Sequence, residues 1–191
     1  MTGVRVTGGE LRGRKLRLPH GAEIRPTSDR ARQAFFNIVA SLVPDARFLD
    51  LYAGTGIFSI EAVSRGAREA LAIDASPPAV RELATIATAW GLPVRSLAAT
   101  LPAALHSLAS GPAFDLVYAD PPYDFGGYPQ LASAIELCVP LSGHAIAAIE
   151  HRNGETPYQG VALSRLRHFR TSRYGNVAIS FFDLAQPNER S

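Results

Sequence analysis

Residues 47–62 read RFLDLYAGTGIFSIEA. The part up to Tyr52 is a short apolar run typical of a buried strand, and residues 57–65, closed by Gly66, have the pattern of a helix. Between the two, Gly54 and Gly56 tolerate the backbone angles of a sharp turn and leave room for a ligand, because they have no Cβ. In an open α/β sheet, ligands bind in the crevice at the carboxyl ends of the strands. The segment therefore predicts a strand, a turn and a helix, with a ligand site at the turn.

Short apolar runs continue to alternate with helical segments as far as residue 150. Strands are expected at residues 47–52, 70–74, 94–98, 114–120 and 144–150, and helices between them at residues 57–65, 77–90, 101–108 and 130–139. This alternation is typical of a parallel sheet that helices cover on both faces. Residues 163–174 and 176–184, separated by Gly175, predict an antiparallel hairpin that closes one edge of the sheet. The fold class is therefore α/β, with a mostly parallel sheet of seven strands.

The N-terminal residues predict a basic β-hairpin, with strands at residues 4–7 and 15–18 and glycines in the connection. Its cations are enough for several contacts to nucleic-acid phosphates, and they are Arg12, Arg14, Lys15 and Arg17. A hairpin that is merely solvated is the alternative. We expect residues 1–24 to form this extension, residues 25–185 the main domain and residues 186–191 a flexible tail.

A helix is predicted directly after the hairpin. Thr27 or Ser28 is expected to cap it and Asp29 to lie in its first turn. Apolar residues then recur at helical spacing until Pro44.

Composition excludes several classes of protein. With 191 residues, 47% apolar and 19% charged, the chain is expected to form one domain with a packed core. The single cysteine, Cys138, excludes an intrachain disulfide and a cysteine-rich metal site, and fits the cytoplasm. The five histidines show no metal-ligand spacing, so no metal is expected. No segment has the pattern of a signal peptide or a membrane helix, so no membrane association is expected.

The net charge of +2 hides an uneven distribution. Residues 1–46 carry +4, residues 47–150 carry −5 and residues 151–191 carry +3. Phosphate contacts are expected from the basic hairpin near the N-terminus, whereas the second cluster, Arg165, Arg167, Arg170 and Arg173, is interpreted as a solvated face.

Asp74 extends the glycine-turn motif. It ends the next predicted strand 20 residues after Gly54, where a carboxylate can accept hydrogen bonds from both ribose hydroxyls of a nucleoside. The Lys-Ser/Thr pair of a phosphate-binding loop is missing, and Ser59 stands where a dinucleotide fingerprint has its third glycine. A nucleoside ligand other than ATP or NAD is therefore favoured.

The second motif is Asp120-Pro121-Pro122-Tyr123, at the end of the strand predicted at residues 114–120. Two prolines remove two backbone donors, so the carbonyls around them are expected to be unshared acceptors. Together with the Asp120 carboxylate they can face an amino group, and Tyr123 offers a ring on which a base can stack. A proline-rich turn with an aromatic plug is the alternative for this motif alone.

Taken in order, the two motifs are similar to those of class I S-adenosylmethionine-dependent methyltransferases that act on exocyclic amines of nucleic-acid bases. More closely, the chain resembles the RsmD-type small-subunit ribosomal RNA guanine-N2 methyltransferases over roughly residues 4–150. The resemblance is carried by GGELRGRKLRLP (8–19), Arg25-Pro26-Thr27-x-Asp29-Arg30, Phe36-Asn37 and LDLYAGTGIFSIEAVSRGA (49–67).

The resemblance implies a Rossmann-like class I methyltransferase fold, S-adenosylmethionine as cofactor and ribosomal RNA as partner. It assigns catalysis to Asp120, Pro121, Pro122 and Tyr123. It assigns cofactor binding to Arg25, Thr27, Asp50, Tyr52, Ala53, Gly54, Thr55, Gly56, Asp74, Ala75 and Ala99. RNA binding would fall to the four cations of the hairpin.

One departure from the family concerns the adenine side of the cofactor. The family usually has an acidic residue after the third strand of the sheet, whereas this chain has Leu97-Ala98-Ala99-Thr100. Adenine is then expected to be held by backbone groups and apolar contacts.

Three functions follow from these patterns. The first is methylation of the guanine N2 amine in small-subunit ribosomal RNA. The alternative is a DNA amino-methyltransferase acting on adenine N6 or cytosine N4, because the Asp-Pro-Pro-Tyr motif serves all three amines, although 191 residues leave no separate target-recognition domain. A third hypothesis is a nucleic-acid-binding protein that has lost catalysis, suggested by the missing acid on the adenine side.

Overall fold

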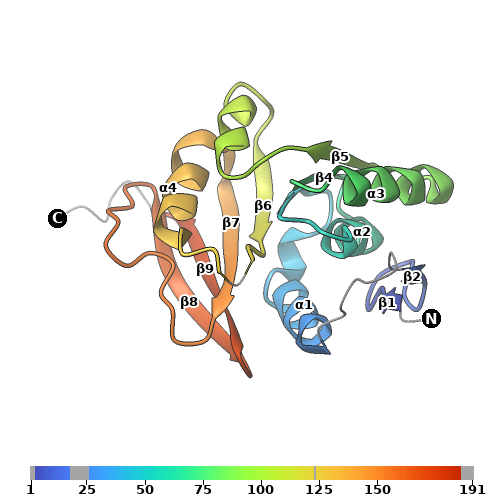
Figure 1. Cartoon of the computed structure of the whole chain (residues 1–191), viewed down its shortest axis with the longest axis horizontal. Helices are drawn as coiled ribbons and strands as arrows, with labels where there is room; N and C mark the ends of the chain where they lie inside the picture. The colour runs from blue at the N-terminus through green and yellow to red at the C-terminus, as the bar shows by residue number, and fades with distance from the viewer. Residues whose placement is uncertain (1–2, 18–25, 123, 186–191) are drawn as a thin grey trace.

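A seven-stranded sheet between helices forms the centre of the computed structural model, which describes residues 3–17, 26–122 and 124–185 (Figure 1). The strand order is β5-β4-β3-β6-β7-β9-β8. In that order the strands are Val94–Ala98, Glu69–Asp74, Arg47–Leu51, Phe114–Ala119, Leu141–Arg152, Val177–Leu184 and Leu166–Tyr174. Strands β3 to β7 are parallel to one another, and β9 is antiparallel to both β7 and β8. The predicted α/β class, parallel sheet and C-terminal hairpin are therefore confirmed.

The helices agree with the sequence pattern, with two exceptions. Helices α2, α3 and α4 span Ile57–Ser64, Pro77–Trp90 and Tyr128–Cys138. The helix expected at residues 101–108 is instead the short 3₁₀ helix η2, Ala103–Leu108, so its predicted type was wrong. Helix α1 spans Pro26–Ile38 and is followed by the 3₁₀ helix η1, Ala40–Leu42. The cap predicted at Thr27 or Ser28 was wrong, because the helix already begins at Pro26, and proline is well suited to the first turn.

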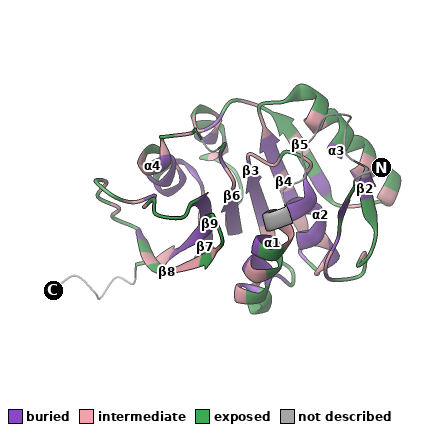
Figure 2. Ribbon diagram, turned by 60° about the horizontal axis from the view of Figure 1, so that its bottom comes forward, coloured by how far each residue is buried: buried purple, intermediate pink, exposed green. Residues whose placement is uncertain are grey.

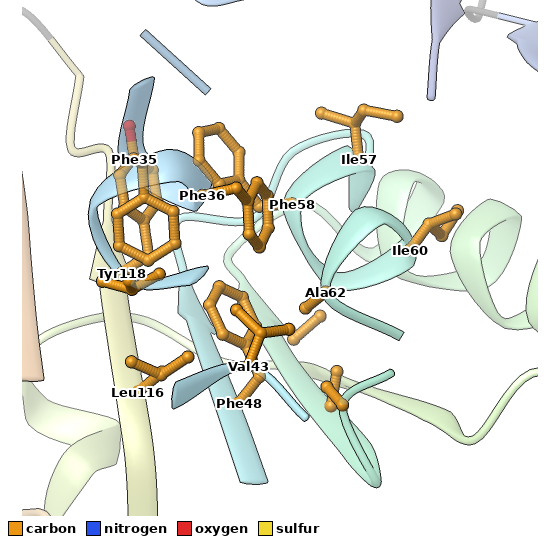
Figure 3. Close-up of a cluster of buried hydrophobic side chains, with 14 of the residues drawn as sticks. Phe35, Phe36, Val43, Phe48, Ile57, Phe58, Ile60, Ala62, Leu116 and Tyr118 are labelled. Atoms are coloured by element: carbon orange, nitrogen blue, oxygen red, sulfur yellow. The ribbon is translucent and has the colours of Figure 1, made fainter. Parts of the chain in front are cut away.

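Two apolar clusters show which helices cover which face of the sheet. Helices α1, α2 and α3 pack on one face, and α4 with η2 packs on the other. The central strands are correspondingly buried, whereas β8 at the edge is largely exposed or half-buried (Figure 2). On the α1 side, the ring of Phe35 lies 4.9 Å from that of Tyr118 and 5.9 Å from that of Phe58 (Figure 3).

The N-terminal hairpin packs against the main domain. Its antiparallel strands are β1, Gly3–Arg5, and β2, Lys15–Arg17. Val4, Val6 and Leu16 are buried in the same cluster as α1 and α2. At Gly9, where φ is +76°, an added Cβ would lie 1.8 Å from the carbonyl oxygen of Ser64, so this contact requires glycine. The predicted hairpin is confirmed, and it shares the core of the domain.

A buried ionic cluster joins the hairpin, α1 and α2. The carboxylate of Glu61 accepts hydrogen bonds from Arg32 Nε at 2.8 Å and from Arg65 Nη2 at 2.7 Å, and also from the backbone N–H and the hydroxyl of Thr7. The side chains of Arg32 and Glu61 are fully buried. Burial tends to raise the pKa of Glu61, but the hydrogen bonds outweigh it and lower the pKa below the ordinary value. The carboxylate is therefore held ionised between three elements.

Candidate active site

Both predicted motifs lie at the carboxyl edge of the sheet, on adjacent strands. In the parallel register, Leu51 at the end of β3 pairs with Ile73 of β4 on one side and with Ala119 of β6 on the other. The backbone N–H of Asp120 donates to the carbonyl of Leu51 at 3.2 Å, and that of Ala53 donates to the carbonyl of Ile73 at 3.1 Å. The glycine turn thus lies between Asp74 and Asp120.

The turn itself consists of residues 52–56 and has three residues in the left-handed region. The φ angles of Tyr52, Gly54 and Gly56 are +59°, +52° and +70°. A Cβ on Gly56 would lie 2.4 Å from the side chain of Leu83, which would have to move, and the positive φ also disfavours any other residue there. A Cβ on Gly54 would meet no atom within 4 Å, so Gly54 faces open space. The exposed backbone at Gly54 leaves room for a ligand against the turn.

Asp74 connects the turn to the next helix. Its Oδ2 accepts a hydrogen bond from the backbone N–H of Gly54 at 2.7 Å, and its Oδ1 accepts one from Ser76 at 2.8 Å. A carboxylate has about four acceptor positions, so two described hydrogen bonds leave capacity for hydroxyl donors. Ala75, the next residue, is exposed.

Asp50 lies beneath the turn. Only 2% of the residue is exposed, and Oδ2 accepts hydrogen bonds from the backbone N–H and the hydroxyl of Ser59, at 3.0 and 2.7 Å. Burial raises the pKa of Asp50 to about 7, although both hydrogen bonds from Ser59 lower it. Asp50 therefore binds the first turn of α2 to β3. The sequence pattern shows Ser59 only as the residue in place of the third glycine of a dinucleotide fingerprint, and does not predict its contact with Asp50.

The segment that departs from the family lies next to Asp74. Ala98 pairs with Asp74 across β4 and β5, and the backbone N–H of Ala99 donates to the carbonyl of Asp74 at 2.9 Å. Leu97 is 41% exposed. This side of the site therefore offers backbone groups and apolar surface.

The loop after β6 supplies the acceptor groups. Asp120 is half-buried, Pro121 is buried and Pro122 is exposed. The carbonyl of Pro122 accepts a hydrogen bond from the backbone N–H of Phe125 at 2.9 Å, so the expectation of unshared carbonyls was wrong for this residue. This hydrogen bond closes the turn that follows the two prolines. The Asp120 carboxylate and the Pro121 carbonyl remain the candidate pair for binding an amine.

Two aromatic residues were missed in the sequence, Phe125 in this loop and Tyr128 at the start of α4. The ring of Phe125 lies 5.5 Å from that of Tyr52 and 5.5 Å from that of Tyr128, both edge to face. The two aromatic residues follow the prolines closely in the sequence, which only weakly indicates that their rings pack together. The hydroxyl of Tyr52 is buried without a hydrogen-bond partner among the described residues, and burial raises its pKa to about 12. A buried hydroxyl without a partner is rare, so a bound molecule fits here.

The cations of the hairpin lie away from this edge. Arg12 and Lys15 are exposed, and the guanidinium of Arg14 lies 3.9 Å above the ring of Trp90 at the end of α3. The hairpin also contacts the end of α2, where Ser64 accepts a hydrogen bond from Leu11 at 2.9 Å. The end of α2 is about 12 Å from its start at the glycine turn. The cations of the hairpin therefore lie at a distance from the candidate acceptor groups.

Some predicted site residues cannot be placed. Arg25, Tyr123 and the tail at residues 186–191 lie outside the described residues, as do the side chains of Arg17 and Thr27. Within the part of the chain that is described, no group of three or more His, Cys, Asp or Glu side chains is arranged to hold a metal ion. None of the helices described has the length and apolar character needed to cross a membrane.

Comparison with known proteins adds independent information. The family described as conserved hypothetical protein 95 matches residues 4–183. The chain is 33% identical over 151 residues to "Ribosomal RNA small subunit methyltransferase D" of Escherichia coli, covering 77% of this chain and 74% of the relative. It is 30% identical to YlbH of Bacillus subtilis, to which an rRNA methyltransferase activity is ascribed, over 94% of this chain and 98% of the relative.

A solved structure agrees with these sequence relatives. The Escherichia coli protein yhhF, assigned as a methyltransferase, superimposes with a TM-score of 0.82 at 29% identity. The alignment covers 96% of this chain and 98% of the solved one. The hairpin, the sheet and the C-terminal strands are therefore all within the shared fold.

Proposed function

The chain belongs to the RsmD family of ribosomal RNA methyltransferases, the family described as conserved hypothetical protein 95, and we propose that it methylates the exocyclic N2 amine of a guanine in small-subunit ribosomal RNA. One observation carries this proposal. The Asp120 carboxylate and the Pro121 carbonyl follow β6 directly beside the open glycine turn at the end of β3. An amine acceptor site next to a nucleoside site is the arrangement that methyl transfer between the two requires.

S-adenosylmethionine fits the turn between Asp74 and Asp120. Asp74 has acceptor capacity for ribose hydroxyls, and the open backbone at Gly54 admits the methionine part. The Tyr52 hydroxyl, which has no partner among the described residues, is a further candidate donor. Leu97 and Ala99 offer the apolar surface for adenine. When bound, the cofactor supplies a methyl group that its sulfonium already activates.

The protein then has to position the amine. The lone pair of the amine nitrogen is delocalised into the guanine ring, so the amine is a poor nucleophile while its nitrogen stays planar. Hydrogen bonds from the two amine protons to Asp120 and Pro121 favour a pyramidal nitrogen, and they strengthen as positive charge develops. The guanine has to leave its stack to reach these acceptors, and Tyr123 is proposed to stack on it.

The experiment is tritiated methyl transfer with the purified protein. Small-subunit ribosomal RNA, assembled small subunits and duplex DNA are compared at equal salt, and the products are digested to nucleosides. We expect label in N2-methylguanosine. Label in N6-methyladenine or N4-methylcytosine of DNA, with none in RNA, would replace the proposal by the DNA alternative. Cofactor binding without transfer to any substrate would favour a binding protein.

Asp74→Ala should weaken binding of S-adenosylmethionine by about 1–3 kcal/mol, because ribose hydroxyls would lose a charged acceptor. Calorimetry measures the change. Asp115→Ala is the control, since Asp115 also accepts a hydrogen bond from a backbone N–H, that of Arg47, at 2.8 Å, but at the amino edge of the sheet. Equal affinities for Asp74→Ala and wild type would remove Asp74 from the cofactor site.

Replacing Arg12 and Lys15 together with alanine should weaken RNA binding and leave cofactor binding unchanged. The slope of log K against log salt should fall by about 1.4–1.8, since each phosphate contact contributes about 0.7–0.9. Arg14 is left intact because its contact with Trp90 also stabilises the hairpin. The control removes two exposed arginines elsewhere, Arg81 and Arg95. A slope equal to that of wild type would show that the hairpin turn does not bind RNA.

A further inference from the structure

Strand β8 lies in a segment without acidic residues. Residues 156–182 contain no Asp or Glu, and the segment contains four arginines: Arg165, Arg167, Arg170 and Arg173. Strand β8 is one edge of the seven-stranded sheet, so one of its sides has no neighbouring strand. The edge strand of the sheet therefore carries an excess of positive charge, from Arg167, Arg170 and Arg173.

A β-bulge in this strand exposes an aromatic ring. His168 pairs with Phe182 and Arg170 with Phe181, so Phe169 has no partner on β9. Phe169 is 42% exposed, and no other Phe, Tyr or Trp among the described residues is classed as exposed. Its ring lies 6.1 Å from that of Phe181, which places it on the face that α1 covers. Bulges commonly redirect a side chain, and this one directs Phe169 outward.

The arginine next to the bulge has no acidic partner in the part of the chain that the structure describes. Arg167 forms an ion pair with Asp183 at 3.0 Å, and the guanidinium of Arg165 donates to the carbonyl of Glu136 at 3.0 Å. Arg170 donates from Nε to the hydroxyl of Ser172 at 2.9 Å, and within the described residues no carboxylate lies within ion-pair distance of it. Phe169 and Arg170 are adjacent, and below they are called the bulge pair. The bulge pair joins an exposed ring to an uncompensated charge.

The strand register places the bulge pair three strands from the active site. Arg170 pairs with Phe181 of β9, Phe181 pairs with Ala148 of β7, and Ala148 pairs with Tyr118, which lies two residues before Asp120. Three steps between strands amount to about 14 Å. The hairpin packs on α2 and α3, toward the opposite side of the sheet (Figure 1). The acceptor groups therefore lie between two basic surfaces.

We propose that the bulge pair is a second RNA contact, in which Phe169 stacks on a base and Arg170 binds a phosphate of single-stranded RNA flanking the methylated guanine. The inference rests on the proposed function. Unpaired bases stack well on aromatic rings, and a guanidinium binds phosphate. Protection of the sheet edge explains charged residues there, but it does not explain an exposed phenylalanine, which makes an open edge more prone to association.

The test uses the full chain with small-subunit ribosomal RNA, free and in assembled subunits. Phe169→Ala should raise Kd about tenfold or more, and Phe169→Tyr, which keeps the ring, should restore binding. Arg170→Ala should lower the log–log salt slope by about 0.7. Leu137→Ala is the control for loss of an exposed apolar side chain, since Leu137 is 72% exposed on α4. Arg167→Ala is the control for loss of an arginine from the same strand.

The outcomes separate the two proposals. Wild-type RNA affinity in both Phe169→Ala and Arg170→Ala, with methyl transfer intact, would overturn the second contact and leave the proposed function standing. Equal losses of RNA affinity in Leu137→Ala and Phe169→Ala would also overturn it, because the effect would then not depend on the position of the side chain. Failure of the wild-type protein to bind or methylate either RNA would overturn both.

Discussion

Asp120→Ala should lower methyl transfer to RNA at least about a hundredfold while S-adenosylmethionine binds nearly as before, because the lost carboxylate acts on charge that develops only in the transition state. Asp120 is half-buried and follows β6, whereas Asp74 lies on the far side of the glycine turn. Single-turnover methyl transfer with saturating RNA and cofactor measures the rate, and calorimetry measures cofactor affinity.

The loop also provides a matched control for this variant. Asp124 lies four residues further on, its side chain is 99% exposed and it pairs with Arg152 at 3.4 Å. Surface ion pairs of this kind contribute little to stability, so Asp124→Ala should fold normally and transfer methyl groups at close to the wild-type rate. If Asp120→Ala kept a rate within about threefold of Asp124→Ala, the assigned role in orienting the amine would be wrong, since removal of such an acceptor costs at least about a hundredfold.

Glu61→Ala should have the largest effect on stability, about 3–5 kcal/mol of the free energy of unfolding. The substitution leaves the fully buried Arg32 guanidinium without its buried partner and also removes the acceptor for Thr7 in the hairpin. Urea denaturation followed by circular dichroism measures the change. Because a loss of this size approaches the whole stability of many domains, Glu61→Gln, which keeps the shape and one acceptor oxygen, is measured beside it.

Glu82→Ala is the control for removal of a glutamate from a helix. Glu82 is exposed on α3, so its loss should change the free energy of unfolding by no more than about 0.5 kcal/mol. A similar small change for Glu61→Ala would show that the ionic cluster does not hold the hairpin and the two helices together.

The position of the candidate active-site groups follows from patterns that are local in the sequence. The apolar run before Gly54, the strand ending at Asp74 and the strand before Asp120 can each be recognised from a few neighbouring residues. Since parallel strands end at the same edge, recognising them is enough to predict that these groups meet. The observed register between β4, β3 and β6 confirms this.

Contacts between distant segments could not be predicted in the same way. Arg32 and Glu61 are 29 residues apart, and nothing in either helix indicates that their charged groups are buried against each other. The contact of Arg14 with Trp90 and that of Phe125 with Tyr52 likewise depend on how separate elements pack. Even the cap predicted at Thr27 was wrong, because the local preference of a threonine was weaker than that of the proline before it.

The bulge in β8 shows what periodicity in the sequence cannot predict. Alternation of side chains along a strand predicts its two faces only if the register is regular, and one extra residue at Phe169 changes which side chains are exposed after it. Periodicity and turn residues were therefore sufficient for the class of fold and the edge at which its motifs meet. Tertiary structure decided the buried ionic cluster, the hydrogen bond from Phe125 to the Pro122 carbonyl and the exposed ring on β8. The free energy of such contacts depends on how far the groups are buried, and their burial is set by segments that are distant in the sequence.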